Sequence, residues 1–459
     1  MLSLTLRPLS VPVRPERVFT ALTDGADYAF WLDSARNESP MSRFSYLGVV
    51  PDGADILRVE HASAAENPFA ALERAAASAP QVQNAPAELR DELLGGYVGY
   101  FGYEARRALG FPAPHEAATP DALWMPALRY LIIENASGRA WLVGDEEWVE
   151  STSAWLDRDG GEMMGDLAAE PQPLDLDLTL PEREAYEAKI RECLHEIYEG
   201  NSYEVCLTAE TRGRLPETLY NPQGIIDLYL AQRDHNAAPY AALLKCGDHW
   251  VLSSSPERFL TVDSTGAAET KPIKGTVPRA SSVEEDRTRA AWLREDAKTR
   301  AENLMIVDLL RNDLSRVSEP GTIEVPVLMG VESYATVHQL VSTVRGRLRP
   351  GVGAVEAAAV CFPGGSMTGA PKPSTMQIID RLEDRPRGIY SGALGFFSAS
   401  GAANLSIVIR TLVVLPGGKV SLSAGGAIVA DSDPGAEYDE MVTKLRAALP
   451  PSVARRSAR

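Results

Sequence analysis

Apolar positions recur with two different periods in the C-terminal part of the chain. From Ala290 to Leu310 they return every three or four residues, which predicts an amphipathic helix. From Leu405 to Val414 they alternate with other residues, which predicts a strand that turns into a partner strand at Val420–Ala424. A last helical pattern runs from Pro434 to about Leu449, with Asp433 or the serine before it placed to cap the helix.

The N-terminal part of the chain shows shorter strand-like runs. Two of them are Ala29–Leu32 and Arg129–Ile133, and the glycine- and aromatic-rich stretch Gly95–Gly102 indicates strands that approach closely. Strands and helices mix along the chain without a regular βαβ repeat. The patterns therefore predict an α/β or α+β fold.

A change of composition divides the chain. Residues 157–183 are acidic, rich in proline and glycine, and free of aromatic side chains, which predicts an exposed connection. We therefore expect an N-terminal portion at 1–156, this linker at 157–183, a catalytic portion at 184–450 and a basic tail at 451–459.

The net charge of −18 opposes a nucleic-acid-binding surface, which needs clustered basic residues. The sequence has no apolar run long enough to cross a bilayer, and its first residues lack a secretory signal pattern. The four cysteines are scattered, which fits reduced, buried thiols rather than a metal site. We therefore expect a cytoplasmic protein without a membrane partner, in which an anionic substrate would have to meet local cations or a metal ion.

Three charged residues line one side of the last predicted helix. Glu437, Glu440 and Lys444 recur at helical spacing, so they lie within about 60° of one another beside the apolar stripe. Such a row is common at the solvent edge of a helix, and it also suits a Mg²⁺ site with a lysine nearby for an anion. Glu302 heads an apolar line on its own helix, either as a paired edge residue or as a further ligand.

Three glycine-containing segments are candidates for contact with an anion. Lys274 is followed directly by Gly275, so it is either a surface lysine in a turn or a nucleophile whose pKa is lowered by desolvation. Gly425 and Gly426 follow a predicted strand and either form a plain turn or offer backbone N–H donors. The loop at Phe362–Lys372 lacks the Lys-Ser/Thr ending of a phosphate-binding loop, which excludes a nucleoside triphosphate site.

These residues lie inside longer motifs that follow one another along the chain. The motifs are YEVCLT (203–208), SPERFL (255–260), PIKGT (272–276), ENLMIVDLLRNDL (302–314), VHQLVSTVRG (337–346), FPGGSMTGAPK (362–372), YSGALG (390–395), LSIVIRTL (405–412), AGGAIVADS (424–432) and EYDEM (437–441), with FWLDS (30–34), SRFSYLG (42–48) and GGYVGYFGYE (95–104) before them. In this order they resemble the chorismate-utilising enzyme family, over essentially the whole of residues 185–450. The resemblance implies two large, mainly antiparallel β-sheets packed as a sandwich with outer helices, formed jointly by both portions of the chain.

The resemblance also implies a role for each matching position. Glu257 matches the general acid that protonates the departing C4 hydroxyl of chorismate, and His338 matches a histidine near the substrate ring. Glu302 and Glu440 match Mg²⁺ ligands, with support from Glu437. The remaining matches are Arg410, Tyr390 and Lys444 for the carboxylates of chorismate, and Gly275, Thr276, Gly425 and Gly426 for the backbone cradle around it.

Lys274 separates the branches of the family. Aminodeoxychorismate synthases resemble this chain in PIKGT, whereas anthranilate and isochorismate synthases carry alanine in place of the lysine. The implied mechanism uses Lys274 as a nucleophile at C2 while the C4 hydroxyl leaves, after which ammonia attacks C4 and expels the lysine. Glu204 stands where isochorismate and salicylate synthases carry a water-activating lysine and many aminating relatives carry glutamine, and its role is left open.

We therefore expect component I, the chorismate-aminating subunit, of an aminodeoxychorismate synthase. Anthranilate synthase component I is the alternative within the family, and a non-catalytic binding protein is the alternative outside it. The cysteines lie in no glutamine amidotransferase motif, so a separate glutamine amidotransferase partner or free ammonia is implied. The product leads to p-aminobenzoate, for folate or for a specialised metabolite such as an antibiotic, and the sequence leaves both open. Ser34 matches the position of a tryptophan pocket, which is either regulatory or a structural relic.

Overall fold

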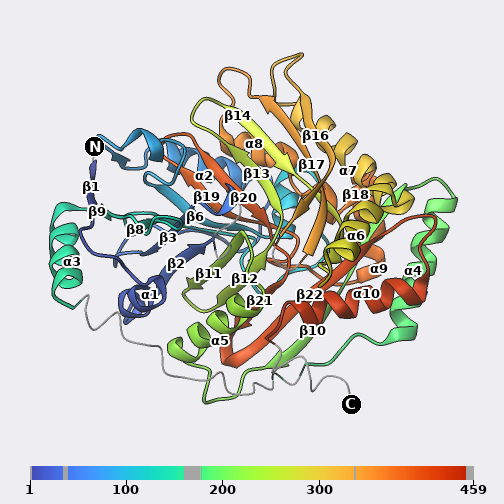
Figure 1. The fold of residues 1–459 in the computed structure, drawn as a ribbon, viewed down its shortest axis with the longest axis horizontal. Coiled ribbons are helices and arrows are strands. Elements are labelled where there is room, and N and C mark those ends of the chain that lie inside the picture. The colour runs from blue at the N-terminus through green and yellow to red at the C-terminus, as the bar shows by residue number, and fades with distance from the viewer. Residues whose placement is uncertain (1–2, 35–39, 160–175, 177, 335–336, 451–459) are drawn as a thin grey trace.

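The computed structural model describes residues 3–34, 40–159, 176, 178–334 and 337–450. Two large sheets dominate the molecule, and helices surround them (Figure 1). Neighbouring strands are antiparallel throughout both sheets except for one short parallel pair at an edge. The expected sandwich of two mainly antiparallel sheets with outer helices is therefore confirmed.

The first sheet joins twelve strands of the described residues. Their order is β18 (Gly369–Ala370), β10 (Glu204–Arg214), β22 (Lys419–Ile428), β21 (Thr411–Leu415), β12 (Trp250–Ser255), β11 (Tyr240–Cys246), β2 (Tyr28–Asp33), β3 (Phe44–Val49), β8 (Arg129–Glu134), β9 (Ala140–Gly144), β1 (Ser3–Pro8) and β5 (Gln81–Val82). The predicted strands at 29–32 and 129–133 are β2 and β8, which confirms both. N-terminal and C-terminal strands join where β2 pairs with β11.

The second sheet joins ten strands of the described residues. Their order is β15 (Ile273–Pro278), β17 (Val337–Arg347), β14 (Ala267–Lys271), β13 (Arg258–Val262), β20 (Ala403–Ile407), β19 (Ala393–Ser398), β6 (Gly96–Phe101), β7 (Ala122–Pro126) and β4 (Leu57–Val59), with β16 (Glu324–Ser333) paired to β17. The glycine-rich stretch predicted to pack closely is β6, where a Cβ added to Gly99 would lie 2.0 Å from the Leu123 carbonyl oxygen.

Helices cover the outer face of each sheet and bury an apolar core there. The twelve-stranded sheet is covered by α1 (Pro15–Thr23), α3 (Glu146–Asp159), α4 (Arg183–Tyr198), α5 (Pro222–His235), α9 (Lys372–Glu383) and α10 (Pro434–Ala447). The ten-stranded sheet is covered by α2 (Pro68–Ala77), α7 (Ala297–Ser315) and α8 (Ala354–Cys361), while α6 (Val283–Glu295) packs beside β15 and β17.

The space between the two sheets differs along its length. Around β2, β6 and β19 it is filled by large apolar side chains, among them Phe30, Tyr100 and Phe396. Toward β10 and β15, which lie at or beside the sheet edges, charged side chains occupy it instead. A charge is costly to bury without a partner, so this polar end is the natural place to look for chemistry.

Two predicted elements are wrong in a way that matters for the site. The helix predicted at 290–310 is two helices, α6 and α7, because Asp296 leaves the helical conformation and its side chain caps α7 by accepting from the Thr299 N–H. The strand predicted at 405–414 is likewise two strands, β20 and β21, which belong to different sheets. The chain crosses between the sheets through Arg410, whose φ is +51°.

The end of the chain follows the sequence more closely. The helix α10 begins after Asp433, whose carboxylate accepts from the Ala436 N–H, so the predicted cap is confirmed. Gly425 and Gly426 lie inside β22 and do not follow it, because this strand extends beyond its predicted end. Most of the predicted linker, residues 160–175 and 177, and the predicted tail at 451–459 lie outside the described residues.

Candidate active site

A bulge in β15 positions Lys274. The register of β15 against β17 shifts between Ile273 and Thr276, so one strand bends locally and re-aims its side chains. Gly275 adopts a φ of +79°, and a Cβ there would lie 2.4 Å from Thr299 Cγ2 at the start of α7. Glycine is therefore required at this position both by its backbone conformation and by its packing.

The Lys274 side chain crosses from the ten-stranded sheet to the twelve-stranded sheet. Its Nζ donates to Glu204 Oε1 on β10 at 2.9 Å, and both side chains are buried. Burial acts to lower the pKa of Lys274, but the Glu204 and Glu302 carboxylates outweigh it, and the pKa is raised above its ordinary value. The expectation of a desolvation-lowered pKa is therefore wrong for this ion-paired state, in which Lys274 is an ammonium group.

Glu204 is incompletely hydrogen-bonded. Its side chain is 1% exposed, and among the described residues its Oε2 atom has no hydrogen-bond partner. A buried carboxylate oxygen without a partner carries an unrecovered desolvation cost, which structural ion pairs normally avoid. The pair is thus held by one hydrogen bond and leaves an acceptor atom unused inside the site.

Glu257 lies in the short segment between β12 and β13 and is also buried. Burial raises its pKa to about 7, against the lowering effects of the Ser366 hydroxyl and of nearby cations that include Lys274. A carboxyl group with such a pKa is substantially protonated near neutral pH and can act as a proton donor.

Charged residues of α10 gather over β22 at Gly426. A Cβ added to Gly426 would lie 3.1 Å from Glu437 Oε2 and 3.8 Å from Glu440 Oε1. Glu440 pairs with Lys444 at 2.6 Å, and Lys444 Nζ also donates to the Gly425 carbonyl oxygen at 2.9 Å. The row predicted from helical spacing is therefore directed at the glycine pair.

Lys298 links the metal-ligand candidates. Its Nζ lies 3.0 Å from Glu437 Oε1 and 3.8 Å from Glu302 Oε1, and the Ser432 hydroxyl donates to Glu437 Oε1 at 2.7 Å. Among the described residues no three acidic, histidine or cysteine side chains form a ready metal shell. The carboxylate oxygens nevertheless suit Mg²⁺ chemically, and the Lys298 ammonium stands in as the cation between two of them.

The remaining substrate-site candidates differ in their contacts. Tyr390 is buried, and burial raises the pKa of its hydroxyl. The Arg410 carbonyl accepts from the Ser254 N–H at 3.1 Å, which fixes the crossing between the sheets. Gly425 admits no side chain, because a Cβ would lie 2.1 Å from the Leu207 carbonyl oxygen, and the Thr276 hydroxyl accepts from the Gln339 amide at 3.5 Å.

His338 is engaged elsewhere. Its Nδ1 lies 2.7 Å from the Ser333 hydroxyl, and its Nε2 lies 3.0 Å from Asp286 Oδ1 on α6. These contacts tie α6 to β16 and β17 and include no other predicted site residue. The role near the substrate ring stays a prediction.

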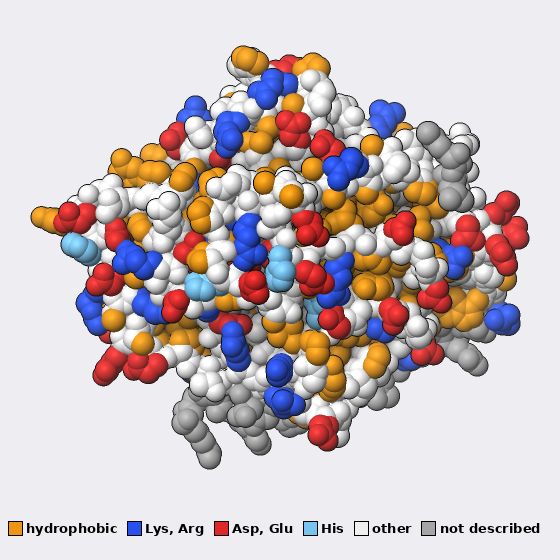
Figure 2. Space-filling view, turned by 180° about the vertical axis from the view of Figure 1, so that it is seen from behind, with side chains coloured by type: hydrophobic (Ala, Val, Ile, Leu, Met, Phe, Trp, Pro, Cys, Tyr) orange, Lys and Arg blue, Asp and Glu red, His pale blue; other side chains and the backbone are white. Residues whose placement is uncertain are grey.

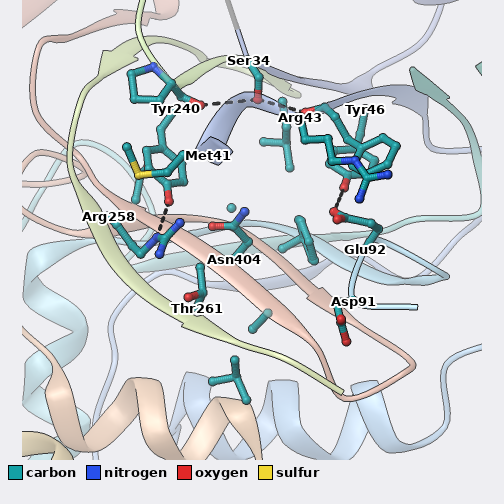
Figure 3. A pocket seen from close by; sticks show the side chains of 18 of the residues that line it. Ser34, Met41, Arg43, Tyr46, Asp91, Glu92, Tyr240, Arg258, Thr261 and Asn404 are labelled. Atoms are coloured by element: carbon teal, nitrogen blue, oxygen red, sulfur yellow. Dashed lines mark hydrogen bonds between the residues drawn. The ribbon is translucent and has the colours of Figure 1, made fainter. Parts of the chain in front are cut away.

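Ser34 lines a separate cavity of about 470 Å³ between the two sheets (Figure 3). Its hydroxyl donates to the Phe44 carbonyl oxygen at 2.9 Å, a contact that links β3 to the end of β2. Across the cavity Arg258 donates to the Tyr240 hydroxyl at 2.7 Å. Ser34 therefore both lines a pocket and holds its wall, and tryptophan as the occupant stays a prediction.

Sequence reasoning missed Lys298, Ser366 and Ser432. Lys298 precedes Glu302 by four residues on one helix, so helical spacing alone could have paired them. Ser432 was considered as a helix cap, whereas its hydroxyl bonds the Glu437 carboxylate five residues later. Ser366 lies in the glycine-rich loop, and its nearness to Glu257 depends on tertiary structure.

One face of the molecule carries charges of both signs (Figure 2). Figure 2 shows acidic and basic side chains intermingled on one face, in contrast to the broad basic surface that nucleic acid requires. In the described part of the chain, every helix is too short or too polar to span a membrane.

The chain is similar to known enzymes over most of its length. It is 43% identical to the aminodeoxychorismate synthase of Streptomyces pristinaespiralis over 95% of this chain and 63% of that protein. It is 35% identical to anthranilate synthase component 1 of Haloferax volcanii, over 96% of this chain and 92% of that protein.

A solved structure is similar as well. The crystal structure of anthranilate synthase component I from Streptococcus pneumoniae superposes with a TM-score of 0.75 at 27% identity, covering 90% of this chain and 93% of that one. The chain spans between 50% and 63% of the length of the four curated relatives from Streptomyces and plants that it matches. Residues 27–450 match the family described as chorismate binding enzyme. Fold, motifs and this match agree, and the chain belongs to the chorismate binding enzyme family.

Proposed function

We propose that this chain is the chorismate-aminating part of an aminodeoxychorismate synthase, which converts chorismate and ammonia to 4-amino-4-deoxychorismate. The observation that carries the proposal is Lys274, a buried lysine between the two sheets that is paired with a carboxylate of the opposite sheet. The higher identity to an aminodeoxychorismate synthase, 43% against 35% for an anthranilate synthase, supports the same choice.

In the proposed reaction Lys274 Nζ forms a bond to C2 of chorismate, and the ring double bonds shift toward C4. The C4–O bond breaks, and Glu257 donates its proton so that the hydroxyl leaves as water. The pKa of about 7 at Glu257 supports this assignment, since the proton must be available near neutral pH. Ammonia then forms a bond to C4, and the C2–N bond to Lys274 breaks.

Substrate binding would draw on the charges gathered over β22. Lys444, Arg410 and the Tyr390 hydroxyl are proposed to meet the carboxylates of chorismate, with backbone groups of Gly275, Thr276, Gly425 and Gly426 around the ring. Glu302, Glu437 and Glu440 would hold Mg²⁺, which would neutralise a substrate carboxylate when bound. Local positive charge of this kind offsets the net charge of −18.

Ammonia has to be delivered to this site. We propose a glutamine amidotransferase as the partner that supplies it, with free ammonia as a substitute in the test tube. The pathway would then continue from the product toward p-aminobenzoate. Anthranilate synthesis is the second candidate function, favoured by the relative from Haloferax volcanii, of which the chain covers 92%.

The two candidates separate by product. Purified protein would be incubated with chorismate, Mg²⁺ and ammonium at mildly alkaline pH, and the products would be resolved by mass. A 4-amino product that yields p-aminobenzoate after a lyase is added supports the proposal, whereas fluorescent anthranilate formed without a lyase supports the alternative.

The Lys274→Ala substitution tests the mechanism in the same assay. We expect formation of the 4-amino product to fall on the order of 10³-fold or more, because the covalent route is lost. Lys271→Ala is the matched control, since Lys271 on β14 pairs with Glu332 on β16 within the ten-stranded sheet. Undiminished turnover by Lys274→Ala would remove the lysine from the mechanism.

A further inference from the structure

We propose that Glu204 is the base that takes the proton from Lys274 and so generates the nucleophile. This inference rests on the proposed function, because it presumes that Lys274 attacks the substrate. It gives a chemical role to a carboxylate that the sequence places in the site without explaining it.

The geometry suits a direct proton transfer. Lys274 Nζ and Glu204 Oε1 are 2.9 Å apart, within the range needed for transfer without an intervening water. The two residues lie on strands of different sheets, β15 and β10, so their contact depends on how the two sheets pack against each other. A substrate that enters between the sheets would find the amine and its base already side by side.

Glu204 also has an oxygen without a hydrogen-bond partner in the described part of the chain, as a base needs. Glu383, a buried carboxylate at the end of α9 that faces β10, is bonded by the Thr208 N–H and hydroxyl and by two Arg387 nitrogens. Protonation of Glu383 would break charge-assisted bonds on both of its oxygens. Glu204 makes one such bond, and its Oε2 atom has no partner among the described residues, so one of its oxygens stays open to accept a proton.

The surrounding carboxylates favour the charged lysine, whereas the exclusion of water by substrate favours a neutral pair. The groups that act on Lys274 are the carboxylates of Glu204, Glu302, Glu257 and Glu440 and the Cys206 thiol. In the free protein, the first two carboxylates hold the lysine as an ammonium. Proton transfer within the pair converts two buried charges into two neutral groups, and such a change becomes more favourable as the surroundings become drier.

The proposed step balances as follows. One proton passes from Lys274 Nζ to a Glu204 oxygen, and the freed lone pair on Nζ forms the Nζ–C2 bond. The C4–O bond breaks at the same time, and Glu257 gives its proton to the leaving hydroxyl, which departs as water. In the second half ammonia bonds to C4 and gives a proton to the Glu257 carboxylate. The C2–N bond breaks, the lysine nitrogen takes its proton back from Glu204, and both carboxyl groups return to their starting states.

The Glu204→Gln substitution tests the proposal, because an amide oxygen can still accept the lysine hydrogen bond but cannot take its proton. The readout is the Lys274 adduct formed when protein and chorismate are mixed with Mg²⁺ and without ammonia, quenched at intervals and measured by intact-protein mass spectrometry. We expect the variant to form the adduct about 10²-fold more slowly or worse. The KM for chorismate should change by no more than a few-fold, and the residual rate should rise steeply with pH as hydroxide replaces the base.

Glu210→Gln is the matched control, since Glu210 lies on the same strand and pairs with Arg212 at the surface. It should form the adduct at the rate of the unmodified protein. An unchanged rate and pH profile in Glu204→Gln would overturn the role of Glu204. If the unmodified protein forms no lysine adduct and Lys274→Ala turns over normally, the nucleophilic role of Lys274 fails. If the product is anthranilate, the proposed function fails, so these outcomes are distinguishable from a failure of Glu204 as the base.

Discussion

Two buried clusters of charge flank β10, and they are built in opposite ways. In the first, two nitrogens of Arg387 donate hydrogen bonds to the Glu383 carboxylate, and Arg387 also donates to the Met367 and Cys206 carbonyl oxygens. In the second, Lys274 and Glu204 share one hydrogen bond, and one Glu204 oxygen has no partner among the described residues.

The difference follows from what each cluster has to do. Arg387 lowers the pKa of Glu383 in spite of its burial, so that cluster is fixed in one charge state and serves as a structural tie between β10 and the segment after α9. Arginine presents a rigid fork and stays charged, whereas lysine offers a single point charge that can lose a proton. In the proposed mechanism the second cluster changes its charge state, and its single hydrogen bond suits that role better than a fork of bonds would.

The largest expected effect comes from breaking the structural cluster. Arg387→Met should lower the free energy of unfolding by about 3 to 5 kcal/mol, because it leaves the buried Glu383 carboxylate without its partner. Urea unfolding followed by circular dichroism measures this change. Arg381→Met is the control, since Arg381 pairs with Glu196 at the surface and should cost about 1 kcal/mol or less. Equal losses in the two variants would contradict the comparison.

Glu257→Gln should lower activity without lowering stability above pH 7. Loss of the proton donor should lower kcat about 10²- to 10⁴-fold. In the unmodified protein, kcat/KM should fall as pH rises through about 7, where Glu257 loses its proton, and the variant should lack this decline.

The stability of the Glu257→Gln variant gives an independent check. The folded carboxyl titrates near pH 7 and the unfolded one near 4.5, so between these values the folded state binds more protons. The contribution of Glu257 to the free energy of unfolding therefore decreases as pH rises across this window. Above pH 7 the glutamine variant should be as stable as the unmodified protein or more so, and a clear loss of stability there would contradict the assignment.

The smallest effect is expected at Lys298, which stands between two of the metal-ligand candidates. Lys298→Met should tighten Mg²⁺ binding several-fold, because a competing cation is removed from Glu437 and Glu302. Isothermal titration of the protein with Mg²⁺ measures this affinity, and Glu440→Gln should weaken it by removing a charged oxygen ligand. Weaker binding by Lys298→Met would show that the lysine supports the metal and does not compete with it.

Local patterns in the sequence predicted the elements that depend on neighbouring residues. The helix α10 and its cap at Asp433 follow from helical spacing and capping chemistry, and the row of Glu437, Glu440 and Lys444 follows from the same period. The break at Asp296 was missed because helical spacing continues across it, and the break before β21 was missed because alternation continues through Arg410. Both breaks arise where the chain must change direction to join another layer.

The periods of the side chains by themselves determined the mixed α and β class. The motifs indicated the family, and the resemblance that they carry implied the sandwich of two sheets and the candidate site residues. The tertiary structure alone decided that Lys274 meets Glu204, which lies 70 residues away in sequence and in the other sheet. It also decided that Glu257 has a pKa of about 7 and that Lys298 stands among the metal-ligand candidates. Burial and charge at a point in space are sums over segments that are distant along the chain, so no local pattern contains them.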